Sequence, residues 1–206
     1  MPSRSTADEL KQIMSVRPNN NNNERDDDDD DNKRHDPSPT SYPVFEPHIT
    51  LASIHLETPV SLSMIRRNVL PQQRPFLVEF GSVDVGDHYF RSVYITVVLD
   101  ETLKKLRRAV QETLDVYSNT PCYPHMSLVY ITDEDQEVGR ERERYFDELR
   151  GRKLISYDDG GGVKLRTPDL KSGWFKGSMM TEIWVTRSVG PVETWEVLDK
   201  IILSQS

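Results

Sequence analysis

The sequence predicts an α+β fold in which two pseudo-symmetric lobes of antiparallel β-sheet, with helices outside, enclose a central cleft. Segments with the alternation of strands are interspersed with segments of helical periodicity, which favours this class. A histidine pattern also occurs twice, as His48-x-Thr50 in "FEPHITL" and as His125-x-Ser127 in "YPHMSLVY". An aromatic residue and a proline precede each histidine and an apolar stretch follows it, which indicates an internal duplication. A chain of 206 residues suffices for one such body.

The first segment, residues 1–16, is expected to form a short helix that docks on the body. Thr6 followed by Glu9 matches a capping box at the start of a helix. The apolar residues that follow recur on one helical face, namely Leu10, Ile13 and Met14. We expect this face to make the docking contact.

Residues 17–43 form a polar insert that we expect to be disordered, because asparagines and aspartates cannot bury enough apolar surface to offset the entropy of ordering. Residues 19–36 hold eight acidic and three basic side chains, a net charge of −5 out of −8 for the chain. The remainder, at −3, is nearly neutral. This balance argues against binding of long nucleic acid, which depends on many Lys and Arg contacts to phosphates. A small phosphorylated ligand is compatible with it.

The body, residues 44–206, contains the remaining predicted elements. In order, they are a strand after Pro47, a helix over 61–70, two strands around a turn at Gly86, a helix over 101–118, a strand after Pro124, a helix over 133–152 with solvated basic residues, a glycine-rich loop over 157–164, strands within 174–191 and a helix over 192–203. Four large aromatic side chains are expected in the core, namely Phe90, Trp174, Trp184 and Trp195.

The repeated histidine pattern suggests a chemistry. Because residues i and i+2 of a strand share a face, each histidine is expected to lie beside the hydroxyl of Thr50 or Ser127. Hydrolysis of a phosphodiester needs one neutral imidazole to take a proton from water and one protonated imidazole to supply the leaving oxygen. Hydroxyl groups can hold the non-bridging oxygens. The scheme requires no metal and no cofactor, and the sequence has no H-E-x-x-H motif and no cysteine cluster.

Four stretches together resemble the fungal and plant 2',3'-cyclic-nucleotide 3'-phosphodiesterases of the two-histidine phosphoesterase superfamily. They are "FEPHITL", "HYFRSVYI", "YPHMSLVY" and "GPVETWEVL", and the similarity extends from about residue 44 to about residue 198. A single H-x-T motif occurs by chance in many chains, whereas two in order with the other stretches are specific. The resemblance implies opening of a 2',3'-cyclic phosphate to a nucleoside 2'-phosphate. It also implies a connection with ADP-ribose 1'',2''-cyclic phosphate, a by-product of tRNA splicing.

Carried over to this chain, the first family motif falls on His48 and Thr50, and the second on His125 and Ser127. The resemblance thus implies catalysis by the histidines and phosphate binding by the hydroxyls. The tyrosine after the second motif matches Tyr130, which is expected to contact the substrate if twist or strand termination turns it inward. As a working hypothesis, His125 takes the proton of water and His48 protonates the departing 3' oxygen.

The chain departs from the family at its start. Relatives usually open with an apolar strand immediately before the first helix, and "MPSRST" leaves no room for it, so we expect either a late recorded start or a lost strand. The start also lacks the apolar core of a signal peptide, and Cys122 is the only cysteine, which predicts a cytoplasmic protein without disulfides. The resemblance adds Golgi association, since fungal members have been assigned there. No apolar run is long enough to span a membrane.

Two other functions stay open at this point. One is an RNA-end enzyme of the same superfamily, either a 2'-5' ligase or cyclic phosphodiesterase acting on RNA or an exonuclease, which should have a broader basic groove. The other is a non-catalytic interaction module in which the acidic tract makes the contacts. The two intact motifs speak against this module, whereas the missing first strand speaks for it. We expect an enzyme with a small cyclic phosphate as its substrate, and we expect it to be a monomer.

Overall fold

The computed structural model describes residues 1–19, 36–57, 61–69, 74–115 and 124–203. Its elements in order are α1 (Arg4–Met14), α2 (Leu62–Val69), β1 (Phe76–His88), β2 (Arg91–Val97), α3 (Glu101–Leu114), β3 (His125–Val129), α4 (Asp133–Gly139), α5 (Glu141–Gly151), β4 (Ile155–Tyr157), β5 (Val163–Leu165), β6 (Gly177–Met180), β7 (Glu182–Arg187), the 3₁₀ helix η1 (Val192–Thr194) and β8 (Glu196–Ile202). This mixture of helices and antiparallel strands confirms the predicted α+β class. Most of the polar insert lies outside the described residues.

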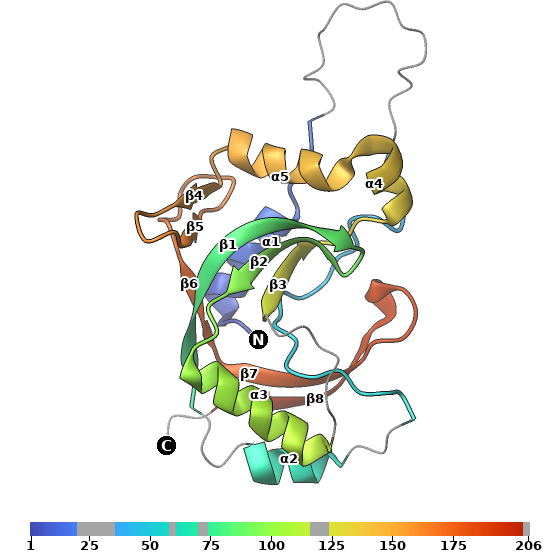
Figure 1. Ribbon diagram of the computed structural model, residues 1–206, viewed down its shortest axis with the longest axis vertical. Coiled ribbons are helices and arrows are strands. Elements are labelled where there is room, and N and C mark those ends of the chain that lie inside the picture. The colour runs from blue at the N-terminus through green and yellow to red at the C-terminus, as the bar shows by residue number, and fades with distance from the viewer. Residues whose placement is uncertain (20–35, 58–60, 70–73, 116–123, 204–206) are drawn as a thin grey trace, which may run out of the picture.

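Four strands form one antiparallel sheet in the order β3-β2-β1-β6. The sheet is strongly curled, and its long strands β1 and β2 arch over the middle of the molecule (Figure 1). The first residues of the chain extend the sheet beyond β6, because Pro2 forms a bridge with Met180 and the Ser3 N–H donates to the Met179 carbonyl at 2.7 Å.

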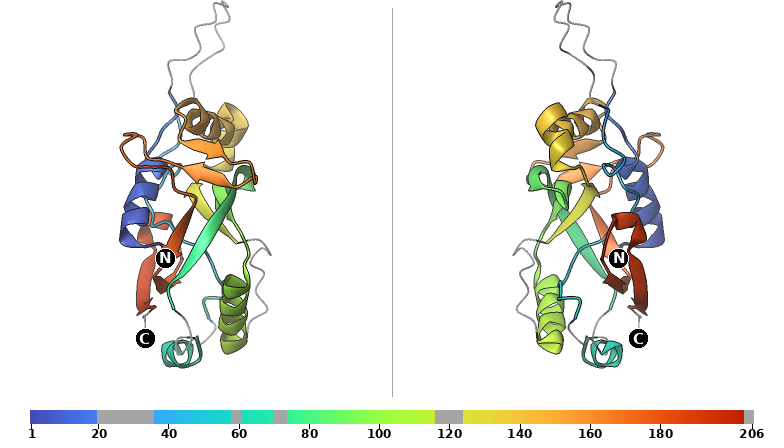
Figure 2. Two further views of the ribbon diagram at one scale, coloured as in Figure 1. Left: turned by 90° about the vertical axis from the view of Figure 1, so that its left-hand side faces the viewer. Right: turned by 90° about the vertical axis from the view of Figure 1, so that its right-hand side faces the viewer.

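The main apolar core lies between this sheet and the helices α1 and α5. The three residues expected on the docking face of α1, Leu10, Ile13 and Met14, are all buried in it. The buried Tyr145 of α5 donates its hydroxyl to the Ile13 carbonyl at 3.0 Å, which ties the two helices together. In Figure 2, α1 lies on one flank of the molecule, α4 and α5 at one end, and α2 and α3 at the other.

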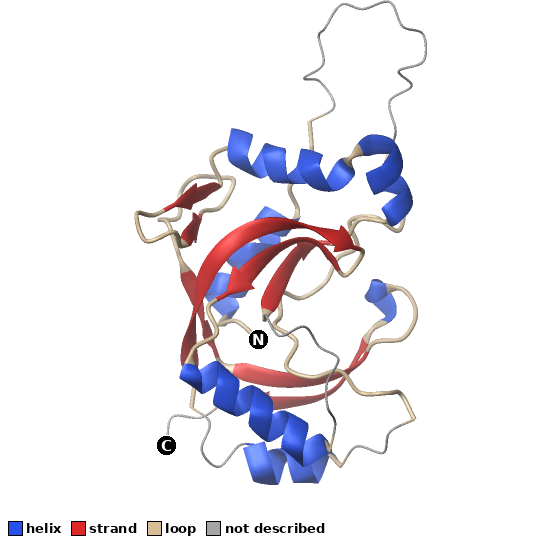
Figure 3. Cartoon of the chain, in the orientation of Figure 1, coloured by secondary structure: helices blue, strands red, loops and turns tan. Residues whose placement is uncertain are grey.

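The hairpin of β7 and β8 forms a separate two-stranded sheet, which packs with α2 and α3 around a smaller apolar cluster (Figure 3). The buried members of this cluster are Ile65, Leu106, Val110 and Ile201. Leu51, which follows the first histidine motif, packs against both clusters. The segment with the first motif therefore lies where the two apolar cores meet.

The predicted helix over 192–203 is wrong, because most of this segment forms β8. Trp195, Leu198 and Ile202 follow the spacing of a helix, but Leu198 is 44% and Ile202 72% exposed, so these residues form no packed stripe. Ile201 is instead buried between exposed neighbours, which is the alternation of a strand, and it pairs with Ile183 of β7.

The predicted strand after Pro47 is also absent, since residues 43–55 have no assigned secondary structure. Pro43 and Pro47 remove two backbone donors within five positions, which weakens strand pairing at this point. Ile49 and Leu51 still pack against the main core, as their alternation predicted.

Three local predictions need correction. The helix over 133–152 is divided at Arg140, whose φ of 49° ends α4, and Arg142 of α5 is buried rather than solvated. The turn expected at Gly86 comes later, because β1 continues to His88. A Cβ at Gly86 would lie 1.9 Å from the carbonyl oxygen of Arg91. The glycine is therefore needed because β1 and β2 approach too closely here for any side chain.

Thr6 does not cap the first helix, because α1 begins at Arg4 and its N-cap residue is Ser3, which makes no capping hydrogen bond. Helix ends depend on the contacts of the preceding residues, and Ser3 is here engaged with β6. In the part of the chain that the structure describes, no helix is long and apolar enough to cross a membrane.

Candidate active site

The second motif lies on β3, at the edge of the four-stranded sheet. His125 is directly opposite Thr96 of β2, and Ser127 is directly opposite Tyr94. Opposed residues of an antiparallel pair point to the same face, so these four side chains share one face of the sheet. The rings of Tyr94 and His125 meet edge to face with centroids 5.3 Å apart. Met126 points the other way, into the core.

A β-bulge explains the position of Tyr130. Tyr94 pairs with Ser127 but the preceding Val93 pairs with Val129, so β3 contains one extra residue. An extra residue reverses the alternation and returns Tyr130 to the face of Ser127. Tyr130 is only 2% exposed, and this burial raises the pKa of its hydroxyl to about 12, partly offset by a hydrogen bond with Ser127. The phenol is thus protonated at neutral pH.

The first motif lies in the segment without secondary structure. The Nδ1 atom of the half-buried His48 is 2.7 Å from the carbonyl oxygen of Glu46. Because a carbonyl only accepts, Nδ1 carries the hydrogen in this contact. Burial lowers the pKa of His48, and the hydrogen bond to Glu46 opposes that effect in part. Thr50 is half-buried, and its hydroxyl has no hydrogen bond to another described residue.

Phe45 connects the two motifs. Its ring stacks on that of Tyr130 with centroids 4.2 Å apart and planes within 11° of parallel. The same ring meets His48 edge to face at 6.1 Å. Nearby, the Tyr42 N–H donates to the Tyr130 carbonyl at 2.8 Å. The chain of contacts therefore runs from His48 through Phe45 and Tyr130 to Ser127.

The hydroxyl of Ser127 also holds the turn between β1 and β2. It donates to the carbonyl of Phe90 at 2.9 Å, and the side chain is only 5% exposed. Ser127 thus links the strand of the second motif to the neighbouring turn.

Phe90 and Trp195, which the sequence predicts to be core residues, lie beside this site instead. Phe90 is 45% exposed, and its ring lies 5.8 Å from the half-buried Trp195 and 5.5 Å from Tyr130. The predicted core position is therefore wrong for Phe90, and it is wrong for Trp174, which is 43% exposed. Trp184, like Trp195, is only half-buried. Phe90 lies in the stretch "HYFRSVYI" and Trp195 in "GPVETWEVL", both of which resemble the family. This resemblance is the sequence feature that points to positions outside the core.

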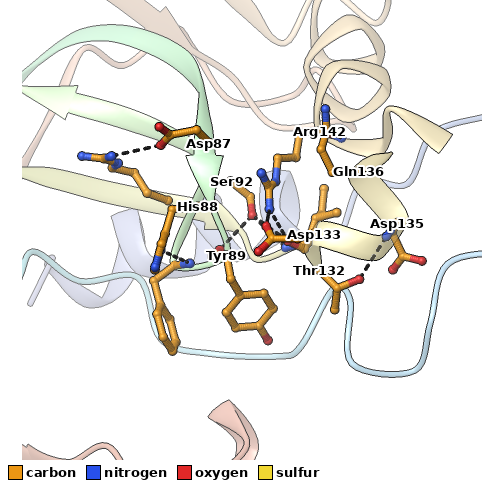
Figure 4. Close-up of polar contacts among 12 residues, drawn as sticks. Asp87, His88, Tyr89, Ser92, Thr132, Asp133, Asp135, Gln136 and Arg142 are labelled. Atoms are coloured by element: carbon orange, nitrogen blue, oxygen red, sulfur yellow. Dashed lines mark hydrogen bonds and ion pairs between the residues drawn. The ribbon is translucent and has the colours of Figure 1, made fainter. Parts of the chain in front are cut away.

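Buried polar contacts fix the turn between β1 and β2 against the end of β3 (Figure 4). The hydroxyl of the fully buried Ser92 donates to the Tyr89 carbonyl at 2.8 Å and accepts from the Ile131 N–H at 2.9 Å. Arg142 in turn donates to the Ile131 carbonyl at 3.0 Å. The aromatic residues of the turn are therefore held in place relative to Tyr130.

Of the other histidines, His88 lies nearest to the second motif in the contacts of the described residues, because its neighbour Phe90 accepts from Ser127. His55 is exposed, His88 contacts the ring of Phe90 with centroids 5.9 Å apart, and His35 is outside the described residues. Within the described ranges, no group of three or more His, Cys, Asp or Glu side chains could hold a metal ion.

Comparison with known proteins identifies similar chains. A family model described as "Cyclic phosphodiesterase-like protein" matches residues 10–203. A 2',3'-cyclic-nucleotide 3'-phosphodiesterase of Kluyveromyces lactis is 27% identical over 183 residues, covering 77% of this chain and 83% of that protein. An uncharacterized protein of Schizosaccharomyces pombe is 31% identical over 88 residues, covering 41% of this chain and 42% of that protein.

Proposed function

Since this chain belongs to the cyclic phosphodiesterase-like family, we propose that it hydrolyses nucleoside 2',3'-cyclic phosphates to nucleoside 2'-phosphates, with His48 and His125 as catalytic residues. The observation that supports the proposal most strongly is the stack of Phe45, three residues before His48, on Tyr130, three residues after Ser127, with centroids 4.2 Å apart. The name of the Kluyveromyces lactis relative supports the same substrate class.

In the proposed reaction, water attacks phosphorus in line with the 3' oxygen. One imidazole takes a proton from the water, the P–O3' bond breaks, and the other imidazole gives a proton to O3'. The phosphate stays on O2'. The hydroxyls of Thr50 and Ser127 donate to the non-bridging oxygens, where negative charge grows. For this, Ser127 turns its one hydroxyl hydrogen from the Phe90 carbonyl to the phosphate when substrate binds.

The surroundings of His48 favour the base role for this residue, which reverses the working hypothesis drawn from the sequence. Burial lowers its pKa, so the neutral form predominates before substrate binds. Nδ1–H is held by the Glu46 carbonyl, which leaves the lone pair of Nε2 for the proton of water. His125 then acts as the acid.

Phe90 and Trp195 are proposed to contact the nucleobase. Both rings keep exposed surface, with Phe90 next to Tyr130 and Trp195 next to Phe90, and aromatic rings stack on bases with little regard to sequence. The buried, protonated hydroxyl of Tyr130 can donate to the ribose or the phosphate.

The two lobes of the expected fold also belong to this proposal. The sheet β3-β2-β1-β6 would form the lobe of the second motif, and the β7–β8 hairpin with α2 and α3 the other. Leu51 supports this division, because it packs against the apolar clusters of both halves. The first motif would then lie where the two halves meet.

Product analysis tests the function. Purified protein is incubated with 2',3'-cyclic AMP or with ADP-ribose 1'',2''-cyclic phosphate, and ³¹P NMR resolves the isomers. Release of only the 2'-phosphate from 2',3'-cyclic AMP is expected, and a 3'-phosphate or no turnover would reject the proposal. A strong preference for an oligonucleotide with a 2',3'-cyclic phosphate end would favour the RNA-end alternative.

A further inference from the structure

The segment that carries His48 has no strand to hold it. None of the backbone groups of residues 43–55 forms a hydrogen bond with the backbone of another described residue. The position of the His48 imidazole therefore depends on side-chain packing and on the anchoring of the chain immediately before it.

Part of that anchoring comes from the Lys11–Glu46 ion pair at 2.7 Å and from the Tyr42 N–H, which donates to the Tyr130 carbonyl. The rest is provided by four residues, which we call the clasp: Ser38, Ser41, Thr132 and Asp135. The Ser38 N–H donates to both carboxylate oxygens of Asp135, at 3.1 and 3.0 Å. The Ser41 hydroxyl donates to the same carboxylate and accepts from the Thr132 N–H at 3.0 Å. Asp135 is fully buried, so these contacts are shielded from water.

The clasp joins the two motif segments. Thr132 caps α4 and lies two residues after Tyr130, so the clasp follows directly from the strand of the second motif (Figure 4). On the other side, Ser41 precedes Tyr42, whose hydroxyl donates to the buried Glu141 at 2.6 Å. The chain then continues to Phe45 and to the first motif.

We propose that Asp135 is a positioning residue for His48. Its carboxylate fixes the chain at Ser38 and Ser41, so the direction from which residues 43–48 enter the site is set by α4. Loss of the carboxylate frees this approach, and His48 shifts relative to the phosphate. A displacement of about 1 Å can cost on the order of 100-fold in rate. The inference rests on the proposed function for its kinetic test, but not for its structural one.

The kinetic test compares Asp135→Asn and Ser41→Ala with the wild type, using 2',3'-cyclic AMP. We expect kcat to fall by roughly 10- to 100-fold with little change in KM, because catalytic alignment is lost and substrate contacts stay. Ser41→Thr keeps the hydroxyl and should restore most of the rate. Asp169→Asn is the matched control, since Asp169 also accepts from a hydroxyl, that of Thr167 at 2.5 Å, but in the loop between β5 and β6.

A double variant separates positioning from general damage to the fold. If Asp135 acts through His48, adding Asp135→Asn to His48→Ala should lower the residual rate no further. An additional loss of the same size as in the wild-type background would overturn the proposal. So would a wild-type kcat in Asp135→Asn.

Hydrogen exchange gives a readout that does not depend on activity. In Asp135→Asn, exchange of the Ser38, Tyr42 and Thr132 amides should accelerate, because these three donate to Asp135, to the Tyr130 carbonyl and to the Ser41 hydroxyl in the intact clasp, while β2 keeps its protection. Unchanged exchange of these three amides would reject the clasp whether or not the enzyme is active. Faster exchange in Asp135→Asn, combined with no turnover by the wild type, would support the clasp and reject the function. If Asp135→Asn does not fold, Ser41→Ala decides by the same criteria.

Discussion

Phe45 and Tyr130 stack face to face with centroids 4.2 Å apart, so a residue just before the first motif rests on a residue just after the second. Replacing Phe45 by alanine should lower kcat by roughly 10-fold, since the alignment of the motifs loosens. The free energy of unfolding should fall by about 1–3 kcal/mol, less than for a fully buried ring, because Phe45 is half-buried. Steady-state kinetics and urea unfolding measure both effects. Phe45→Tyr keeps the stack and is the control; equal rates in Phe45→Ala and wild type would contradict this role.

Ser127 is expected to have two tasks in succession, holding the turn at Phe90 in the free protein and donating to the phosphate once substrate is bound. Ser127→Ala should lower kcat/KM by roughly 10-fold, less than loss of a histidine, because proton transfer survives. Ser127→Thr should retain most of the activity. Ser156→Ala, at a half-buried serine of β4, is the control. A loss in Ser127→Ala as large as in His125→Ala would show that the serine takes part in proton transfer.

The lowered pKa of His48 predicts the acid side of the pH profile. As the base, His48 must be neutral, so kcat/KM should fall as the pH drops through its pKa. Because His125, as the acid, must be protonated, kcat/KM should fall again on the alkaline side. The acid limb should lie below the usual histidine pKa of about 6.5. An acid limb above this value would contradict the role of burial.

A substrate with a good leaving group distinguishes base from acid. p-Nitrophenolate leaves without protonation, so a p-nitrophenyl phosphodiester should restore much of the rate to His125→Ala and little to His48→Ala. The opposite pattern would return His48 to the acid role. Both variants are compared with wild type on the same substrate.

Phe90 and Trp195 should contribute to binding of the base rather than to the chemical step. Because base–aromatic stacking is worth about 1–3 kcal/mol, alanine at either position should raise KM for 2',3'-cyclic AMP by roughly 5- to 150-fold with a smaller effect on kcat. Trp174→Ala is the control, since Trp174 is similarly exposed but lies over Arg166 instead. Effects on kcat alone would exclude a stacking role.

Much of the fold could be predicted because its signals are local. The buried face of α1 follows helical spacing, and the hairpin of β1 and β2 follows alternation. The strand β8 was not predicted, because Trp195, Leu198 and Ile202 have the spacing of apolar residues on one helical face. Hydrogen bonding to β7 determines the structure of this segment instead of its local spacing. Whether residues 43–55 pair with a strand depends on which strand edges the rest of the fold leaves open. A local sequence pattern carries no information about that.

The candidate site was predictable in its residue types but not in its geometry. The repeated pattern makes His48 and His125 candidates, and alternation predicts the shared face of His125 and Ser127, which the pairing with β2 confirms. The bulge that turns Tyr130 to the same face depends on the pairing of β2 with β3. Phe90 was missed because a large aromatic residue is expected inside a small protein, whereas a site needs it at the surface.

The most direct test of the account is the turnover of 2',3'-cyclic AMP in EDTA by the wild type, His48→Ala, His125→Ala and the double variant. Each single variant should lose about 100- to 10,000-fold in kcat while its thermal unfolding stays cooperative. The double variant should be nearly as active as the weaker single variant, because both residues serve one step. Wild-type turnover by either single variant, or losses that multiply in the double variant, would contradict a single site built from the two motifs.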